Sequence, residues 1–472
     1  MLRLVTMRHH FLRKKAMDAV SVIILAAGEG TRMHSSKPKV LHEVCGYSML
    51  AHVLNEALKT SDDICVVLGH KFDEVSAHLN ENFSYEMRKK VHLARQNIQS
   101  HPGTGGAVMA AINSVKNERV VILCADMPLI KARHLHIIAD TGADVNIAVF
   151  KTNNPNGYGR VVLGPDSSVI DIVEQKDADE MQKSIKLCNS GVYSFKTAVL
   201  KELLPKISNK NSSNEYYLTD CISLAFGLNR SVGHVLVNDS DFLGVNDKFA
   251  LAQAEFIMSQ RIKETHLRNG VIMHLPDNIY IDARASLEGE CELWPNVVIK
   301  GECEIENSVI ESGAVIVQSK IKNAHIKAGS IVENSVVENS QIGPMAHLRP
   351  HSIIKHTQIG NFVELKNANL NGVKAGHLSY LGDCEIGVGS NIGCGTVTCN
   401  YDGVKKHQTK IGKNVFVGSN TAFVAPVCIA DDTAIAAGSV VTQNSKKGDL
   451  VIARSKQENK ENGFYKLFGS KK

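Results

Sequence analysis

In the second half of the chain an apolar residue recurs at every sixth position, and this spacing restricts the possible folds more than any other feature. The longest run has six members, and shorter runs precede it: Ile411, Val417, Phe423, Ile429, Ile435 and Val441; Ile386 and Ile392; Ile310 and Ile316; Leu293, Ile299 and Ile305. An amphipathic helix repeats its apolar face about every 3.6 residues and a half-buried strand every second residue, so neither explains a period of six. The pattern predicts a hexapeptide parallel β-helix, in which three short faces make one coil and the periodic residue points inward.

The first half follows a different pattern, in which short apolar runs alternate with amphipathic segments. The runs at 20–28, 63–70, 119–126 and 145–150 are rich in β-branched residues and are predicted to be buried parallel strands. Segments such as 48–60 and 105–114 lie between them and favour helices. This alternation predicts βαβ units in a mostly parallel sheet, whose ligands bind beyond the carboxyl ends of the strands.

Between the two halves, residues 247–268 contain neither glycine nor proline, and Gly270 follows as a natural helix stop. The spacing predicts a helix about 33 Å long, at 1.5 Å per residue, that connects two separate bodies.

Composition narrows the class of protein. With 43% hydrophobic and 21% charged residues the chain is typical of a soluble globular protein, and no apolar run approaches the roughly 18 residues of a membrane helix. The net charge of +5 is concentrated at the ends: residues 1–16 hold five cations and no acid, and residues 446–472 hold eight cations against three acids. The middle is therefore slightly acidic, which argues against nucleic acid as a partner and against stable membrane insertion.

Eleven isolated cysteines without a CxxC pair favour reduced thiols over disulfides or a zinc site. The basic stretch 1–20 has no apolar core for a secretory signal. We interpret it as an upstream start before Met17, with an organelle-type leader as the alternative. The expected location is cytoplasmic.

A glycine-rich segment follows the first predicted strand and reads Leu25-Ala-Ala-Gly28-Glu-Gly30-Thr31-Arg32-Met33. Glycines at such a place let backbone N–H groups approach a phosphate chain. Arg32 and Lys39 add positive charge for phosphates. The segment is neither a Walker A motif nor GxGxxG, because Met33 occupies the position of the third glycine.

LAAGEGTRM followed by KPK resembles the signature of sugar nucleotidyltransferases. From about residue 21 to about 454 the chain resembles the family of bacterial bifunctional N-acetylglucosamine-1-phosphate uridylyltransferases / glucosamine-1-phosphate N-acetyltransferases. The matching segments are GTG (103–105), ADMPL (125–129), NGYGR (156–160), IVEQKDA (172–178), NSGVY (189–193), EYYLTD (215–220), GVN (244–246), LRP (348–350), NFVELK (361–366), KAGHLSYLGD (374–383) and GTVTCNYDG (395–403).

The resemblance implies an α/β Rossmann-like nucleotidyltransferase domain followed by a left-handed parallel β-helix of hexapeptide repeats. We expect a basic leader or upstream start at 1–20, the nucleotidyltransferase domain at 21–246, a helical linker at 247–270, the acetyltransferase β-helix at 271–445 and a basic tail at 446–472. β-Helices of this class usually trimerise, so the resemblance also implies a homotrimer.

For the first domain the resemblance implies uridylyl transfer from UTP to N-acetylglucosamine 1-phosphate, with release of pyrophosphate. Arg32 and Lys39 match catalytic residues that hold the triphosphate, and Asp126 and Asn246 match Mg²⁺ ligands, which suits octahedral coordination completed by phosphate oxygens and water. Matched nucleotide- and sugar-binding positions are Leu25, Ala26, Ala27, Gly28, Lys39, Gln96, Gly103, Thr104, Gly159, Glu174, Asn189 and Asn246. Gly103 and Thr104 match the turn that contacts uracil, with Gln96 as the uracil-contacting glutamine and Gln99 as the alternative. Gly159, Glu174 and Asn189 match positions that hold the sugar. Ala125 departs from the glycine expected before Asp126.

For the second domain the resemblance implies acetyl transfer from acetyl-CoA to glucosamine 1-phosphate, which makes the substrate of the first domain. His377 matches the base that takes the proton of the amine, and Glu364 is expected to tune it. Arg349, Lys366, Tyr380 and Asn391 match the sugar-phosphate pocket, and the acetyl-CoA positions are Cys394, Asn400, Tyr401, Ser419, Ala437 and Arg454. Cys394 departs from the usual alanine.

Two alternatives stay open. The first is a single-activity nucleotidyltransferase, with UTP or another nucleotide, in which the β-helix only regulates or oligomerises. The second is a non-enzymatic scaffold on the same two folds. The retained Arg32, Lys39 and Asp126 argue against a scaffold, and His377 with its neighbouring cations argues against a passive coil.

Overall fold

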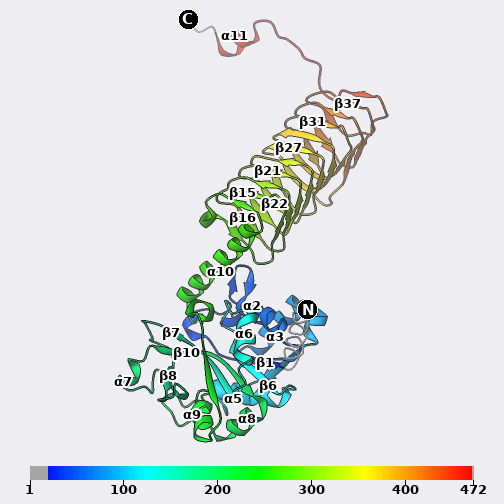
Figure 1. Cartoon of the computed structure of the whole chain (residues 1–472). Coiled ribbons are helices and arrows are strands. Elements are labelled where there is room, and N and C mark those ends of the chain that lie inside the picture. The colour runs from blue at the N-terminus through cyan, green and yellow to red at the C-terminus, as the bar shows by residue number, and fades with distance from the viewer. Residues whose placement is uncertain (1–19, 470–472) are drawn as a thin grey trace, which may run out of the picture. The chain divides into compact units, whose positions relative to one another are not determined.

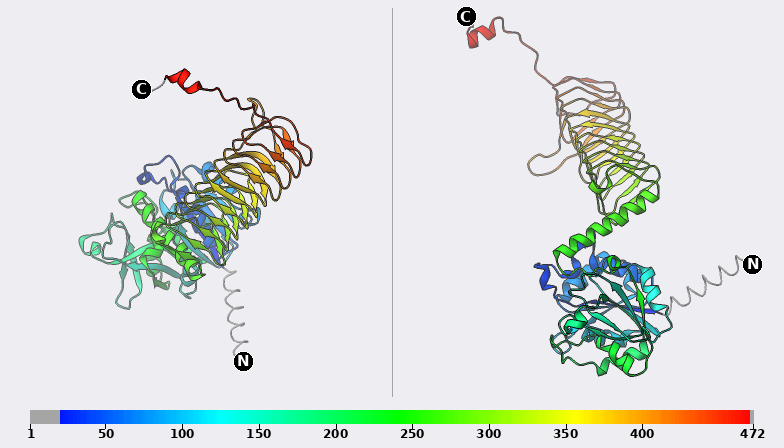
Figure 2. Two further views of the ribbon diagram at one scale, coloured as in Figure 1. Left: turned by 90° about the horizontal axis from the view of Figure 1, so that it is seen from above. Right: turned by 60° about the vertical axis from the view of Figure 1, so that its left-hand side comes forward.

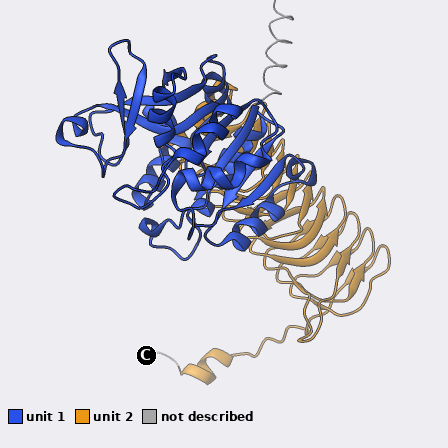
Figure 3. Ribbon diagram, turned by 90° about the horizontal axis from the view of Figure 1, so that it is seen from below, with its two compact units in different colours: residues 1–258 blue, residues 259–472 orange. Residues whose placement is uncertain are grey.

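The computed structural model describes residues 20–469, so the predicted leader lies outside the described residues except for Val20. The chain divides into two compact units, residues 1–258 and 259–472 (Figure 3). The division falls inside helix α10, Lys248–Arg268, which occupies the range expected to be a helical linker.

The first unit is built on a nine-stranded sheet whose central order is β11-β7-β10-β6-β1-β4-β5. Those strands are β1 Val20–Ala26, β4 Ile64–Leu68, β5 Val91–Arg95, β6 Arg119–Cys124, β7 Val145–Lys151, β10 Leu187–Lys196 and β11 Val232–Leu236. The four strands predicted from apolar runs are β1, β4, β6 and β7, and their buried faces confirm that prediction. β10 runs antiparallel between β6 and β7, so the sheet is mixed at that point.

Helices cover both faces of this sheet because alternate strand residues point to opposite sides (Figure 1). Ile23 and Ile122 pack with α5 Gly103–Ala111, α8 Thr197–Leu203 and α9 Asp220–Gly227. Val22 and Val121 belong to the other core. That core is shared with α2 Met49–Leu58, α3 Phe72–Asn82 and α6 Ala132–Ala139. The result is the α/β layered architecture expected for this half.

A hairpin of β8 Arg160–Leu163 and β9 Val169–Val173 joins the main sheet where β8 pairs with β10. The short helix α7 Glu180–Lys183 follows it. This extension brings the 156–160 and 172–178 motifs next to β10.

The second unit is a parallel β-helix, which confirms the prediction from the six-residue period (Figure 2). Its short strands stack into an eleven-stranded sheet and a seventeen-stranded sheet, and every pairing within them is parallel. The periodic residues form one continuous core in which Val417 and Phe423 are fully buried. Each coil therefore stacks its inward residue on that of the previous coil.

The last strand, β39 Leu450–Val451, pairs with β37 Ala434–Ile435. The regular coil therefore continues past residue 445, where we expected the tail to begin. A short helix, α11 Gly463–Phe468, follows within that tail. All eleven cysteines are free thiols, and seven of them are buried. Among residues 20–469 there is no helix with the length and apolar character that crossing a membrane requires.

Candidate active sites

The glycine-rich segment begins where β1 ends, so Leu25 and Ala26 are strand residues and Gly28 opens the loop. Gly30 has a positive φ of 70°, and a Cβ added there would lie 2.5 Å from Cβ of Lys39. Only glycine therefore allows the loop to pass this close to Lys39. The close approach of the loop to Lys39 is thus a property of the backbone and requires no bound ligand.

Four predicted residues from distant parts of the chain converge beside this loop. Nζ of Lys39 donates to Oδ2 of Asp126 at 2.5 Å and to Oδ1 of Asn246 at 2.9 Å. A guanidinium nitrogen of Arg32 donates to the same Asn246 oxygen at 2.9 Å. The side chains of Lys39 and Asp126 are only 12% and 20% exposed. The cluster therefore presents two cations and two oxygen ligands at the carboxyl end of the sheet.

Asp126 and Asn246 also pass a simple test as metal ligands. Their side-chain oxygens already point at one cationic group, the Lys39 ammonium. Val245 donates its backbone N–H to the Asp126 carbonyl at 2.9 Å, which holds the two segments side by side. In the part of the chain that the structure describes, no three His, Cys, Asp or Glu side chains form a metal-binding group. A divalent ion here would need further oxygens from its substrate and from water.

Ala125, the departure from the expected glycine, is fully buried, and its N–H donates to the Leu25 carbonyl at 2.9 Å. Its methyl group packs in the core, so the structure accommodates alanine directly before Asp126. The preceding Cys124 is no nucleophile candidate, because burial raises the pKa of its thiol to about 12.

The turn predicted to contact uracil is organised by Gln96, which is buried. Its amide donates to the carbonyls of His101 and Gly103, at 2.8 and 2.9 Å. Thr104 accepts the backbone N–H of Leu218 at 3.0 Å. Gln99 is exposed. This arrangement favours Gln96 over Gln99 as the residue at the turn.

The predicted sugar positions Gly159, Glu174 and Asn189 lie around one point of the β8–β9 extension. A Cβ added to Gly159 would lie 3.5 Å from Oε2 of Glu174 and 3.6 Å from Cβ of Asn189. The Asn189 amide donates to the hydroxyl of Tyr193 at 2.6 Å, and the Thr219 hydroxyl donates to Glu174 at 3.1 Å. Sequence reasoning missed Tyr193 and Thr219, although both stand inside matched motifs.

Acidic residues lie close to Glu174 and disfavour the charged form of one another. Burial raises the pKa of Glu174, and the negative charges of Asp177, Asp220 and Glu215 add to the effect. Burial, followed by Asp171 and Asp177, raises the pKa of Asp220 to about 6.

We expect Asp220→Asn to stabilise helix α9 at pH 7.5 and to leave it unchanged at a pH below the ordinary pKa of aspartate, near pH 3. Because the folded-state pKa of Asp220 is raised, the free energy of unfolding falls as pH rises from about 4 to about 6, and the asparagine variant lacks that fall. The carboxyl group is partly exposed, so the gain at neutral pH is about 1 kcal/mol. Hydrogen exchange of the α9 amides, compared with wild type at each pH, measures it. An equal effect at both pH values would contradict the explanation.

In the β-helix, His377 begins a column of predicted residues that stand one above another at one corner of successive coils. Gly395 donates to the carbonyl of Leu378 at 3.1 Å, Asn420 to that of Cys394 at 2.7 Å and Gly438 to that of Ser419 at 2.8 Å. Ala437 and Arg454 complete the column, with Cδ of Arg454 3.9 Å from a Cβ added to Gly438. His377 is exposed at its base.

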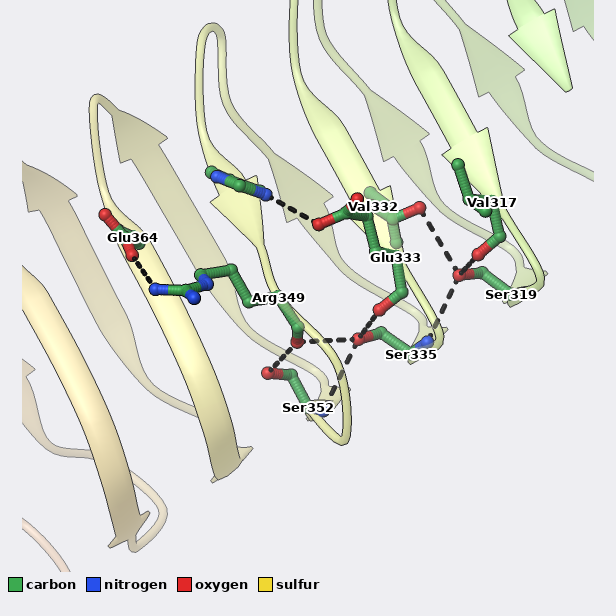
Figure 4. A network of polar contacts seen from close by, with 9 residues as sticks. Val317, Ser319, Val332, Glu333, Ser335, Arg349, Ser352 and Glu364 are labelled. Carbon is green, nitrogen blue, oxygen red and sulfur yellow. Dashed lines mark hydrogen bonds and ion pairs between the residues drawn. The ribbon is translucent and has the colours of Figure 1, made fainter. Parts of the chain in front are cut away.

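A second group lies on the adjoining face, where the strand register aligns His347 with Glu364 and Glu364 with Tyr380. Arg349 donates to Glu364 at 3.0 Å (Figure 4). The backbone of Arg349 is fixed by serine hydroxyls, since Ser335 and Ser352 both donate to its carbonyl. Glu364 therefore pairs with Arg349, and no bond to His377 is present in the described part of the chain.

Asn400 and Tyr401 stand where β32 Val397–Cys399 ends and a loop leaves the coil. Asn400 donates to Asp383 at 2.5 Å and lies 3.5 Å from the Tyr380 hydroxyl. The Tyr380 ring crosses Gly382, where an added Cβ would lie 2.4 Å from the hydroxyl oxygen. Tyr380 and Asn400 therefore lie side by side. Asn391 lies on the other sheet, in β31 Asn391–Ile392, beside Lys374.

Lys406 is a residue that sequence reasoning missed. A hydrogen bond with Lys406 and its positive charge lower the pKa of Lys366, and burial and then the charge of Arg349 add to the effect. Lys406 reaches this place because Tyr401 and Lys406 form a bridge that folds the loop back. The lysine pair at 405–406 was the available signal. Three cations gathered in one place indicate a site for an anion.

The two units thus hold two distinct cationic sites, one on an α/β nucleotidyltransferase sheet and one on a parallel β-helix. Residues 22–187 match the family model described as MobA-like NTP transferase domain. The chain is 54% identical to the Bifunctional protein GlmU of Campylobacter fetus over 453 residues, covering 96% of this chain and 99% of the relative. It is 50% identical to that of Campylobacter lari and 49% to that of Campylobacter concisus, each over 95% of this chain and at least 98% of the relative. The chain belongs to the bifunctional GlmU family.

Proposed function

We propose that this chain makes UDP-N-acetylglucosamine in two steps, acetyl transfer on the β-helix and then uridylyl transfer on the first unit, for cell-envelope precursors such as peptidoglycan and lipopolysaccharide. The observation that supports it most directly is the pair of separate anion sites, Arg32 with Lys39 and Arg349 with Lys366 and Lys406. Each site suits a phosphorylated substrate.

In the uridylyl transfer, a phosphate oxygen of N-acetylglucosamine 1-phosphate attacks the α-phosphorus of UTP and the bond to pyrophosphate breaks. Both reactants are anions, so alignment and charge neutralisation provide most of the catalysis. Lys39 and Arg32 neutralise the triphosphate, Gln96 and Thr104 orient the uracil, and Glu174 and Asn189 fix the sugar. Gly28 allows the backbone of the loop to approach the phosphates.

This half-reaction depends on a divalent metal, and we propose Mg²⁺ held by Asp126 and Asn246. Bound there, Mg²⁺ would neutralise charge on the triphosphate. Since Lys39 now donates to both ligands, it would turn from them toward the phosphates.

In the acetyl transfer, the amine of glucosamine 1-phosphate attacks the thioester carbon of acetyl-CoA. His377 takes the proton that the amine loses, and the C–S bond breaks to release the thiol of CoA after protonation. Arg349, Lys366 and Lys406 hold the sugar phosphate, and Tyr380 contacts its hydroxyls. Asn391 lies on the other sheet, so its part in holding the sugar stays a prediction. Cys394, Asn400, Tyr401, Ser419, Ala437 and Arg454 would line the path of acetyl-CoA.

We further propose a homotrimer, in which the exposed corner bearing His377 meets a neighbouring copy. A cytoplasmic location follows from the substrates, because UTP and acetyl-CoA are available there.

Product analysis tests both steps at once. We expect UDP-N-acetylglucosamine to form only when glucosamine 1-phosphate, acetyl-CoA, UTP and Mg²⁺ are all present. Omitting acetyl-CoA should stop synthesis, and supplying N-acetylglucosamine 1-phosphate should restore it. Formation of UDP-N-acetylglucosamine from N-acetylglucosamine 1-phosphate but never from glucosamine 1-phosphate would indicate a single-activity nucleotidyltransferase. Release of neither pyrophosphate nor the thiol of CoA with any substrate pair would leave a scaffold.

A further inference from the structure

Arg160 is a buried cation that none of the roles above uses. Its residue surface is 0% exposed, and it is among the largest fully buried side chains. Within residues 20–469 no carboxylate lies at ion-pair distance from it; its hydrogen-bond acceptors are neutral. A buried guanidinium without a counter-ion costs free energy unless its donors are satisfied. The hydrogen bonds of Arg160 must therefore offset the free-energy cost of burying its charge.

Those hydrogen bonds join three segments of chain. One terminal nitrogen donates to the Tyr158 carbonyl, the other donates to Oε1 of Gln175 at 2.7 Å, and Nε donates to the Lys183 carbonyl at 3.4 Å. The Gln175 oxygen also accepts the backbone N–H of Gly157 at 3.3 Å. Arg160 thus ties the 156–159 turn to the segment after β9 and to the end of α7.

Each of the first two segments contains a predicted sugar-binding residue next to the residue that Arg160 holds. Tyr158 and Arg160 flank Gly159, and Gln175 follows Glu174 directly. The third predicted sugar-binding residue is coupled as well, because Asn189 donates its backbone N–H to the Gly159 carbonyl at 2.9 Å. Movement of the guanidinium would therefore shift Gly159 and Glu174 relative to each other.

We propose that Arg160 is a positioning residue that sets the spacing of Gly159 and Glu174 and so the affinity for the sugar phosphate, without touching the substrate. The inference rests on the proposed uridylyl transfer. Lysine cannot replace it fully, because one ammonium cannot reach three acceptors in the planar arrangement of a guanidinium.

The test is steady-state kinetics on the full chain with Arg160→Met, Arg160→Lys and Gln175→Leu. We expect Arg160→Met to raise KM for N-acetylglucosamine 1-phosphate at least tenfold while KM for UTP changes less than twofold. Arg160→Lys should restore part of this loss, and Gln175→Leu should raise the same KM by a smaller factor. Lys183→Ala is the matched control, because it keeps the carbonyl that Arg160 uses, and its KM values should equal those of wild type.

A merely structural role predicts a different pattern, a lower active fraction with both KM values unchanged, and that pattern would overturn the proposal. Equal increases in both KM values would also overturn it. If Arg160→Met does not fold, Arg160→Lys and Gln175→Leu decide, and normal KM values in both refute it. Failure of the proposed function is recognised separately, since the wild-type chain would then release no pyrophosphate from UTP. Acetyl transfer by the second unit serves as the internal measure of folded protein.

Discussion

Replacing Lys39 with alanine is expected to lower uridylyl transfer about a thousandfold and to leave acetyl transfer unchanged. A preorganised cation aimed at developing phosphate charge in a water-poor site is worth several kcal/mol, and its removal costs about a hundred- to a thousandfold. Lys39 meets that description, because its side chain is 12% exposed and is held by Asp126 and Asn246. Alanine removes the ammonium without adding bulk beside Gly30.

Pyrophosphate release from UTP and N-acetylglucosamine 1-phosphate measures the first activity, and thiol release from acetyl-CoA measures the second. Lys37→Ala is the control, since Lys37 is nearby but 44% exposed and pairs only with Glu43 in the described structure. Retention of uridylyl transfer within tenfold in Lys39→Ala would remove Lys39 from the catalytic group.

The second large effect is expected from His377→Ala, which should reduce acetyl transfer by about a thousandfold. A positioned general base contributes about a hundred- to ten-thousandfold when an amine must lose its proton during attack. His377 is exposed, so its replacement by alanine removes little packing, and uridylyl transfer and the folded content should stay at wild-type values.

His325→Ala is a suitable control for this variant, because His325 faces outward from the same sheet and pairs with Glu311. Normal acetyl transfer in His377→Ala would show that another group accepts the proton. Loss of both activities in a folded His377→Ala protein would contradict independent sites.

The sequence predicted the fold of the second unit because neither a helix nor a half-buried strand explains a six-residue period. Inward residues such as Val417 and Phe423 had to stack, and the structure places them in one core. The strand β10 was not predicted, because the segment 187–196 lacks the continuous apolar run of its neighbours β6 and β7 and contains Asn189 and Gly191. Its place between them depends on long-range pairing that no local pattern specifies.

The candidate sites were predictable only where a motif was contiguous. Lys39, Asp126 and Asn246 were each identified, but their mutual distances depend on contacts across more than 80 residues. Lys406 was not predicted, because its place beside Lys366 depends on how the loop folds back. Arg160 was inside a quoted motif, yet only its burial and its three acceptors distinguish it from a surface arginine.

The stacked corner from His377 to Arg454 has a consequence for how distance is set along the proposed coenzyme path. Neighbouring coils repeat at about 4.8 Å, so the four steps of this column span about 19 Å whatever side chains occupy it. Adding or deleting one whole coil between Cys394 and Ser419 would change the separation of His377 from Arg454 by about 4.8 Å. A loop such as 400–408 can grow without changing it. The number of coils therefore sets the distance between His377 and Arg454, and a carrier of different length would require a different number of coils.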